Sequence, residues 1–272
     1  MNSSPLIKIL TIKELSKKTY STTMPPIFPD CSLHQTKLVL ITSSNFVLNF
    51  MITPDYVLKS DTETKRLVIL LHGYGASGED LIEIGNFWAP SLPLTTFVAP
   101  NAPHICEINP MGYQWFGLSD FDPMNIRSNL EHAAPRLADF IVAQARAYDL
   151  TMNQVAIMGF SQGAMLALEL MFHLPGLAGV LAYSGSFYRP STIDFKGPYP
   201  PVLLVHGTAD TVVPFIHMET SKKELKNLGV KVDAEQCIGL AHSIDVRGLQ
   251  RGLNFLQASF TKSSSIIVMN SN

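Results

Sequence analysis

From Leu67 onward, short apolar runs alternate with longer segments that have helical spacing, and this alternation constrains the fold more than any other feature of the sequence. Each run is nearly continuous, as expected for a strand buried on both faces of a sheet. Alternating strands and helices predict an α/β fold, with a mostly parallel central sheet covered by helices on both faces. The predicted strands are residues 66–71, 95–99, 154–158, 177–184, 201–206 and 230–237, and the predicted helices are residues 79–88, 126–148, 162–173, 215–228 and 244–260.

The predicted helix at 126–148 has apolar residues every three or four positions, but Pro135 lies inside it. Proline has no amide hydrogen and costs about 3 kcal/mol in a helix interior. We therefore expect a kink or a break at Pro135.

The two ends of the chain depart from the alternating pattern. Residues 1–35 are rich in Ser, Thr and Lys and contain no Arg, which transit peptides usually carry, so we interpret them as a weakly ordered extension. Residues 38–52 are predicted to form two strands and a turn. A single α/β domain is predicted at 36–260 and a polar C-terminal tail at 261–272, and Met51 is a candidate for the natural start.

Charge and cysteine content argue against several classes of protein. The chain has 20 basic and 22 acidic residues with no long run of either sign, so we expect no nucleic-acid partner. Its 3 cysteines are far apart and form no C-x-x-C pair, which argues against a disulfide framework and favours a reducing, cytoplasmic location. No uninterrupted apolar run reaches about 18 residues, so stable membrane insertion is not expected.

A serine lies at the centre of a G-x-S-x-G motif, because residues 159–163 read GFSQG after a predicted strand and at the start of a predicted helix. Flanking glycines remove the Cβ atoms that would clash in a tight strand-to-helix turn, and such a turn exposes the serine hydroxyl above the sheet. We therefore predict Ser161 as a nucleophile, with the amide of Gln162 facing an oxygen that becomes negative. A serine that merely caps the helix is the alternative.

A serine nucleophile needs a base and an acid, which follow it along the chain in the order Asp or Glu, then His, when the serine occupies this kind of turn. Asp210 lies four residues beyond a predicted strand, and His242 lies in a loop that follows the next one. We predict Asp210 as the acid and His242 as the base. His217 is expected on a helix surface, and Asp233 and Asp245 are poorer candidates for the acid.

The segment 71–80, LHGYGASGED, contains three glycines spaced as G-x-G-x-x-G and could be a dinucleotide-binding loop. Such a site needs an acid about 20 residues later, yet residues 84–106 contain neither Asp nor Glu. We therefore interpret the segment as an oxyanion loop in which the amide of Tyr74 is the donor. His72 and His206 each precede a glycine at a strand end, and we expect both to bond to neighbouring backbone.

Six segments together resemble the phospholipase/carboxylesterase family of α/β-hydrolases, which includes the acyl-protein thioesterases. They are LLHGYGASGEDL, VAPNAP, QWF, GFSQGAMLAL, HGTADTVVP and GLAHS, in this order between residues 67 and 260. The resemblance implies an α/β-hydrolase fold and a serine hydrolase that acts on carboxylic esters or thioesters. It implies the same roles for the residues already named and adds Trp115 and Phe116 as part of an acyl pocket.

The expected substrate is a small-molecule or lipid-like ester, or an acylated protein. No metal-binding or phosphate-binding motif occurs, so no cofactor and no metal are expected. Because the base must be neutral, activity should fall as the pH drops through about 6 to 7. The alternatives are a non-catalytic binding module with a hydrolase fold, a nicotinamide-dependent oxidoreductase that uses the loop at 73–78, and an amidase or peptidase. Acyl-chain length depends on loops near residues 115–122 and 187–198, whose shape the sequence does not give.

Overall fold

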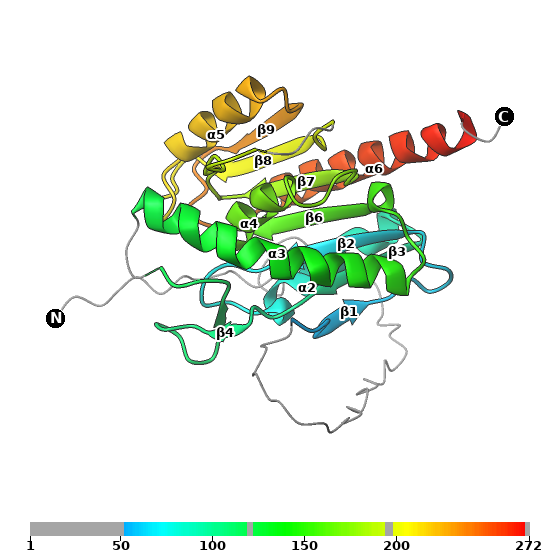
Figure 1. The fold of residues 1–272 in the computed structure, drawn as a ribbon, viewed down its shortest axis with the longest axis horizontal. Coiled ribbons are helices and arrows are strands. Elements are labelled where there is room, and N and C mark those ends of the chain that lie inside the picture. The colour runs from blue at the N-terminus through cyan, green and yellow to red at the C-terminus, as the bar shows by residue number, and fades with distance from the viewer. Residues whose placement is uncertain (1–51, 119–121, 194–197, 270–272) are drawn as a thin grey trace, which may run out of the picture.

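In the computed structural model, which describes residues 52–118, 122–193 and 198–269, a seven-stranded sheet forms the centre of the molecule (Figure 1). The strand order is β1-β3-β2-β6-β7-β8-β9, and only β1 runs antiparallel to its neighbour. The predicted mostly parallel sheet is therefore confirmed. The strands are β1 (Tyr56–Leu58), β2 (Arg66–Leu71), β3 (Thr95–Ala99), β6 (Val155–Phe160), β7 (Gly179–Tyr183), β8 (Val202–Gly207) and β9 (Val232–Cys237).

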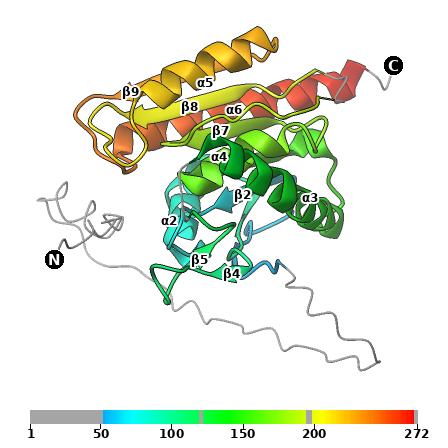
Figure 2. The same cartoon turned by 60° about the vertical axis from the view of Figure 1, so that its left-hand side comes forward.

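Helices cover both faces of this sheet (Figure 2). One face packs against α3 (Pro123–Ala147), α4 (Gln162–Leu170) and α5 (Ile216–Asn227), and the other packs against α2 (Gly78–Trp88) and α6 (Val246–Met269). Successive residues of β2 alternate between these two cores: Leu67 and Ile69 lie in the first, and Val68 and Leu70 lie in the second. Burial on both faces explains why the strands appear in the sequence as continuous apolar runs.

The predicted strands and helices in this region all occur, with ends that differ by a few residues except at the end of the last helix. Three short strands were not predicted: β1 and the small hairpin of β4 (His104–Ile105) and β5 (Tyr113–Gln114). Two or three residues are too few to show a period, so pairing with a neighbour decides their conformation. The predicted N-terminal extension and almost all of the predicted strands at 38–52 lie outside the described residues.

Two predictions about helices need correction. Of the two alternatives predicted at Pro135, the break is wrong, because α3 runs continuously through the proline with packed residues on both sides of it, and the kink stays a prediction. The α6 helix runs to Met269 instead of ending at residue 260. No glycine or proline follows Phe260 in the sequence, so nothing local ends the helix there. The last residues of the predicted polar tail, 270–272, lie outside the described part.

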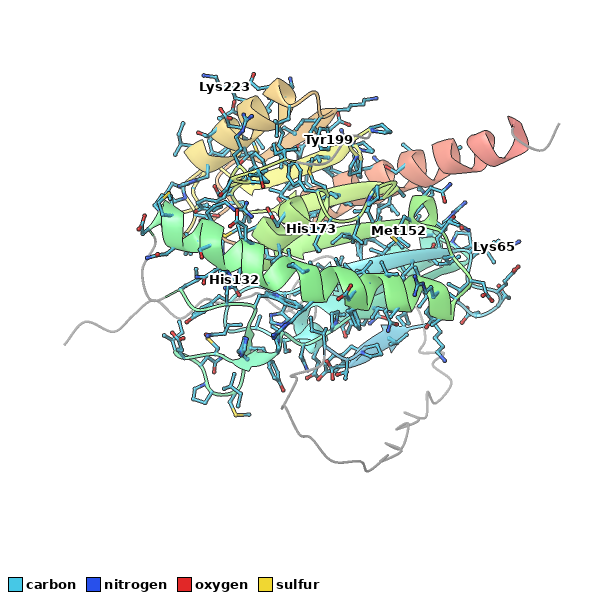
Figure 3. All side chains as sticks on the ribbon, viewed as in Figure 1. Lys65, His132, Met152, His173, Tyr199 and Lys223 are labelled. Atoms are coloured by element: carbon cyan, nitrogen blue, oxygen red, sulfur yellow. The ribbon has the colours of Figure 1, made fainter. Side chains whose placement is uncertain are left out.

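A buried ion pair joins α3 to α4 on one face of the sheet. Arg127 Nη1 donates a 2.7 Å hydrogen bond to Glu169 Oε2, and its Nη2 lies 2.5 Å from Oε1. Arg127 also donates to the carbonyl of Tyr188, in the segment that follows β7. Burial raises the pKa of the Glu169 carboxyl, but hydrogen bonds from His173 (Figure 3) and Arg127 outweigh this, and the pKa lies below its usual value. The pair therefore holds two helices and a loop together.

Replacement of Arg127 by Met should destabilise the protein by about 3 to 5 kcal/mol, because Glu169 is left as a poorly compensated buried charge. The double variant Arg127→Met/Glu169→Met should lose clearly less. Arg251→Met is the matched control, since its pair with Asp233 is largely exposed and should contribute at most about 1 kcal/mol. Urea unfolding measures all three. Equal losses for the single and double variants would show that the buried charge is not the cause.

Candidate active site

Ser161 lies in a sharp turn between β6 and α4, with backbone angles φ 53° and ψ −115°. A positive φ is uncommon for a residue other than glycine and marks local strain. The turn is possible because the two flanking glycines have no side chains, for which there would be no room. A Cβ on Gly159 would lie 2.1 Å from the carbonyl oxygen of Gly163, and a Cβ on Gly163 would lie 2.1 Å from the carbonyl oxygen of Leu71. The Ser161 amide donates to the Tyr183 carbonyl of the neighbouring strand. The two motif glycines therefore allow the close packing that presents the serine.

The structure brings Ser161, Asp210 and His242 together at the carboxyl edge of the sheet. Asp210 lies in the turn after β8, and His242 lies in the loop after β9. His242 Nδ1 is 2.7 Å from Asp210 Oδ2, and its Nε2 is 3.0 Å from Ser161 Oγ. A neutral imidazole with its proton on Nδ1 satisfies both contacts, donating to the carboxylate and accepting from the serine hydroxyl. This arrangement can withdraw a proton from the serine.

The Asp210 carboxylate is almost completely buried, with 6% of the residue exposed, and it is fully hydrogen-bonded. The amides of Val212 and Val213 donate to Oδ1 at 2.9 Å each. Nε2 of His206 and Nδ1 of His242 both contact Oδ2. Burial raises the pKa of Asp210, but the hydrogen bonds from the two histidines and from the turn outweigh it and hold the pKa well below its usual value. Asp210 is therefore ionised at neutral pH.

The weaker candidates from the sequence have other partners. Asp233 pairs with Arg251 on the surface, and Asp245 accepts a 2.7 Å hydrogen bond from an amide in the first turn of α6. His217 lies at the start of α5 as predicted, but it is half-buried and its Nδ1 is 3.1 Å from Ser186 Oγ. These contacts leave Asp210 as the acid that reaches His242.

The predicted oxyanion loop follows β2 and lies directly beside the serine. A Cβ on Gly73 would lie 3.3 Å from the Cβ of Ser161, so only a small residue fits there without displacing a neighbour. Gly75 has a φ of +78°, and its amide donates to the carbonyl of Tyr113 in the β4–β5 hairpin. Asn109 Nδ2, from the same hairpin, donates to the Gly75 carbonyl at 2.8 Å. The hairpin that the sequence did not predict therefore holds the loop in place.

The two amides predicted as oxyanion donors have no acceptor among the described residues. Gln162 is the first residue of α4, where an amide has no partner within the helix, and no backbone or side-chain acceptor binds the amide of Tyr74. The Tyr74 phenol is a separate group: burial, with further effects of Cys106 and Glu107, raises its pKa to about 12. The phenol is therefore protonated at neutral pH. The role of the Tyr74 and Gln162 amides as oxyanion donors stays a prediction.

His72 and the Gln162 side chain hold the walls of the site. His72 Nδ1 donates to the Gly73 carbonyl at 2.8 Å, and its Nε2 accepts from the Ala102 amide at 2.9 Å, which confirms the predicted backbone bonding. Burial lowers its pKa to about 4, so the ring is neutral. The fully buried Gln162 side chain accepts from the Trp115 amide and donates to the Phe116 carbonyl. No sequence pattern indicated this second role of Gln162.

Trp115 and Phe116, whose backbone the Gln162 side chain binds, are buried and border a groove of about 430 Å³. The groove is also lined by residues of α3, including Arg136 and His132, the second of which is labelled in Figure 3. Neither the predicted nucleophile nor the predicted base lines it. The role of Trp115 and Phe116 in an acyl pocket therefore stays a prediction.

Residues 54–260 match the sequence profile of the family described as Phospholipase/Carboxylesterase. The chain belongs to this family. The resemblance recognised in the six sequence segments is thus confirmed, and so is the α/β-hydrolase fold.

Three similar proteins illustrate the relationship. The chain is 29% identical to esterase YpfH of Escherichia coli over 76% of its own length and 89% of that protein. It is 29% identical to acyl-protein thioesterase 1 of Schizosaccharomyces pombe over 70% of its length and 89% of that protein. The crystal structure of esterase PE8 matches with a TM-score of 0.72 and 38% identity, over 76% of this chain and 99% of that one.

In this family member the glycine loop at 73–78 lacks the geometry of a dinucleotide site. The amide of Gly78, at the start of α2, donates to Asn101 Oδ1 at 2.8 Å, so a side chain occupies the place of a pyrophosphate oxygen. A Cβ on Gly78 would lie 2.2 Å from the Ala99 carbonyl oxygen, which explains the third glycine by helix–strand packing. Within residues 52–118, 122–193 and 198–261, no cluster of side chains suited to a metal ion occurs. No helix of the described chain is long and apolar enough to cross a bilayer.

Replacement of Gly163 by Ala should lower esterase activity about 100-fold, because the new Cβ meets the backbone of β2 and must displace the turn that carries Ser161. Gly229→Ala is the control, since Gly229, unlike Gly163, has a restrictive φ of +82° but has no atom within 4 Å of an added Cβ. It should lose about 1 to 2 kcal/mol of stability and keep its activity. Steady-state kinetics and thermal unfolding measure both variants. Full activity in Gly163→Ala would contradict the packing argument.

Proposed function

We propose that this protein is a serine hydrolase that cleaves carboxylic esters or thioesters through an acyl-enzyme on Ser161. The observation that carries the proposal is the pair of contacts made by His242, 3.0 Å to Ser161 Oγ and 2.7 Å to Asp210 Oδ2. Membership of a family that includes esterases and acyl-protein thioesterases supports the same reaction.

In the acylation step, His242 Nε2 takes the hydroxyl proton of Ser161 while Oγ forms a bond to the substrate carbonyl carbon. Asp210 holds the proton on Nδ1 and stabilises the imidazolium that forms. The tetrahedral intermediate then breaks its bond to the alcohol or thiol, which leaves with the proton from His242. The product of this step is an ester between Ser161 and the acyl group.

In the deacylation step, water takes the place of the leaving group. His242 removes a proton from the water as its oxygen attacks the acyl carbonyl, and the proton then passes to Ser161 Oγ as the acid is released. In both steps the carbonyl oxygen becomes negative. We assign its stabilisation to the amides of Tyr74 and Gln162, because both lie beside Ser161 and neither is bound by another group of the described protein.

The proposed substrates are small-molecule or lipid-like esters and acylated proteins, in line with the names of the esterase and thioesterase relatives. Trp115 and Phe116 are proposed to contribute to binding of the acyl chain. A cytoplasmic location also remains a proposal, and it is compatible with two buried free thiols, those of Cys106 and Cys237.

Replacement of Ser161 by Ala should abolish both hydrolysis and labelling by a fluorophosphonate, because no other hydroxyl of the described residues is paired with His242. Ser186→Ala is the matched control, since Ser186 is a buried serine on the next strand-end loop whose hydroxyl contacts His217 instead. Fluorescent gel detection and a panel of p-nitrophenyl and thioester substrates of increasing chain length provide the measurements. Equal labelling of wild type and Ser161→Ala would exclude Ser161 as the nucleophile, and an unlabelled wild type would favour a binding module.

The acidic limb of kcat/KM should show a slope of one, because Asp210 remains ionised over it. The pKa of Asp210 lies well below its usual value. The contribution of the ionised carboxylate to the folded protein is therefore complete above the ordinary carboxyl pKa, and it is lost only as the pH falls through the lowered pKa. Initial rates on one p-nitrophenyl ester between about pH 4 and about pH 9 measure the slope. A slope of two would indicate a second titrating group, and a flat profile would exclude a histidine base.

A further inference from the structure

His206 is a further buried histidine beside the candidate active site, at the next-to-last residue of strand β8 and four residues before Asp210. Only 2% of the residue is exposed. Its Nε2 is 2.8 Å from the Val213 carbonyl oxygen and 3.3 Å from Asp210 Oδ2. Both of these atoms are acceptors, so Nε2 carries a proton and donates to them in either charge state of the ring. Bonding of His206 to neighbouring backbone was expected, but its contact with the carboxylate was not.

This contact completes the set of donors around Asp210. Oδ1 accepts from two amides of the turn, and Oδ2 accepts from His242 and is also approached by His206. Because His206 contacts both Val213 and Asp210, it ties the two ends of the turn 210–213 together. The oxygen that His206 contacts is the same one that orients His242.

We propose that His206 is a positioning residue that acts on the base through Asp210. It fixes the direction of the carboxylate, so that Oδ2 faces His242 Nδ1. It also takes part of the negative charge on Oδ2, which weakens the attraction of the carboxylate for a protonated His242. His206 thereby keeps the base neutral and active to lower pH than Asp210 alone would allow.

The ionisable groups on the elements beside this turn contact other partners. His206 is therefore the residue to which we assign the effect on the charge of Asp210 Oδ2. Across from His206 on β9 is Gln236, which is uncharged. On α5, Glu219 contacts that glutamine and His217 contacts Ser186. The remaining ring neighbour, Phe215, meets His206 edge-on at 6.1 Å between ring centroids.

The inference rests on the proposed function, and the test compares three variants with wild type. His206→Leu removes the donor. His206→Gln keeps an N–H at a similar reach, because the Gln amide extends about as far as the Nε2 of His. Leu204→Ala is the control for stability, since Leu204 is a buried residue on the same face of β8 and contacts the core but not Asp210. Each variant is measured by kcat/KM against pH on one p-nitrophenyl ester and by thermal unfolding.

In His206→Leu, kcat/KM at its plateau should fall about 10- to 100-fold, and the midpoint of the acidic limb should move up by about 0.5 to 1 pH unit. His206→Gln should return the midpoint toward that of wild type. Leu204→Ala should lose stability without moving the midpoint. A purely structural histidine would give the same midpoint in His206→Leu as in wild type, and this result would overturn the inference.

Two further results keep the test decisive. If His206→Leu does not fold, His206→Asn replaces it, because the shorter amide cannot reach Asp210 and the midpoint should still rise relative to His206→Gln. If Ser161→Ala is as active as wild type, the proposed function fails instead, whatever the His206 variants show. An inactive Ser161→Ala with an unmoved midpoint in both His206→Leu and His206→Asn rejects the inference alone.

Discussion

The contact between the start of α4 and the end of β2 is the constraint on which the rest of the site depends. Gly163 lies so close to the Leu71 carbonyl that no side chain fits between them, and Gly159 is equally close to Gly163. This packing allows the chain to turn within one residue, with Ser161 in a strained conformation above the sheet. Because β2, β8 and β9 are parallel to β6, the loops that follow them reach the same edge. Ser161, Asp210 and His242 meet there from distant parts of the chain.

Buried carboxylates serve two different purposes in this structure. Glu169 is neutralised by Arg127 and joins helices to a loop, at a distance from the site. Asp210 has no cation of that kind, and its charge is stabilised by two amides and two histidines. Such hydrogen-bond donors stabilise the carboxylate without a lysine or arginine beside it, so the carboxylate can still orient His242 and stabilise it when it becomes protonated. The contact of His206 adjusts how strongly it does so.

The long elements could be predicted because burial on both faces leaves a continuous apolar run and burial on one face leaves a helical period. The short ones could not, since β1, β4 and β5 depend on pairing with neighbours. The same limit applies at Pro135, where the local cost of proline is real but packing along the rest of α3 outweighs it. At the end of α6, polar composition suggested a tail, whereas the absence of glycine and proline let the helix continue to Met269.

The sequence by itself determined the family, the parallel sheet and the three residues at its carboxyl edge, because the order serine, acid, histidine and the position of each after a strand are local features of the chain. Only the tertiary structure decided which groups support them. The Gln162 side chain binds the backbone of Trp115 and Phe116, and the β4–β5 hairpin holds the oxyanion loop. The contact of His206 with Asp210 belongs to the same class. Each of these contacts joins segments whose distance in space depends on the path of a turn. The spacing of residues along the sequence does not indicate that path.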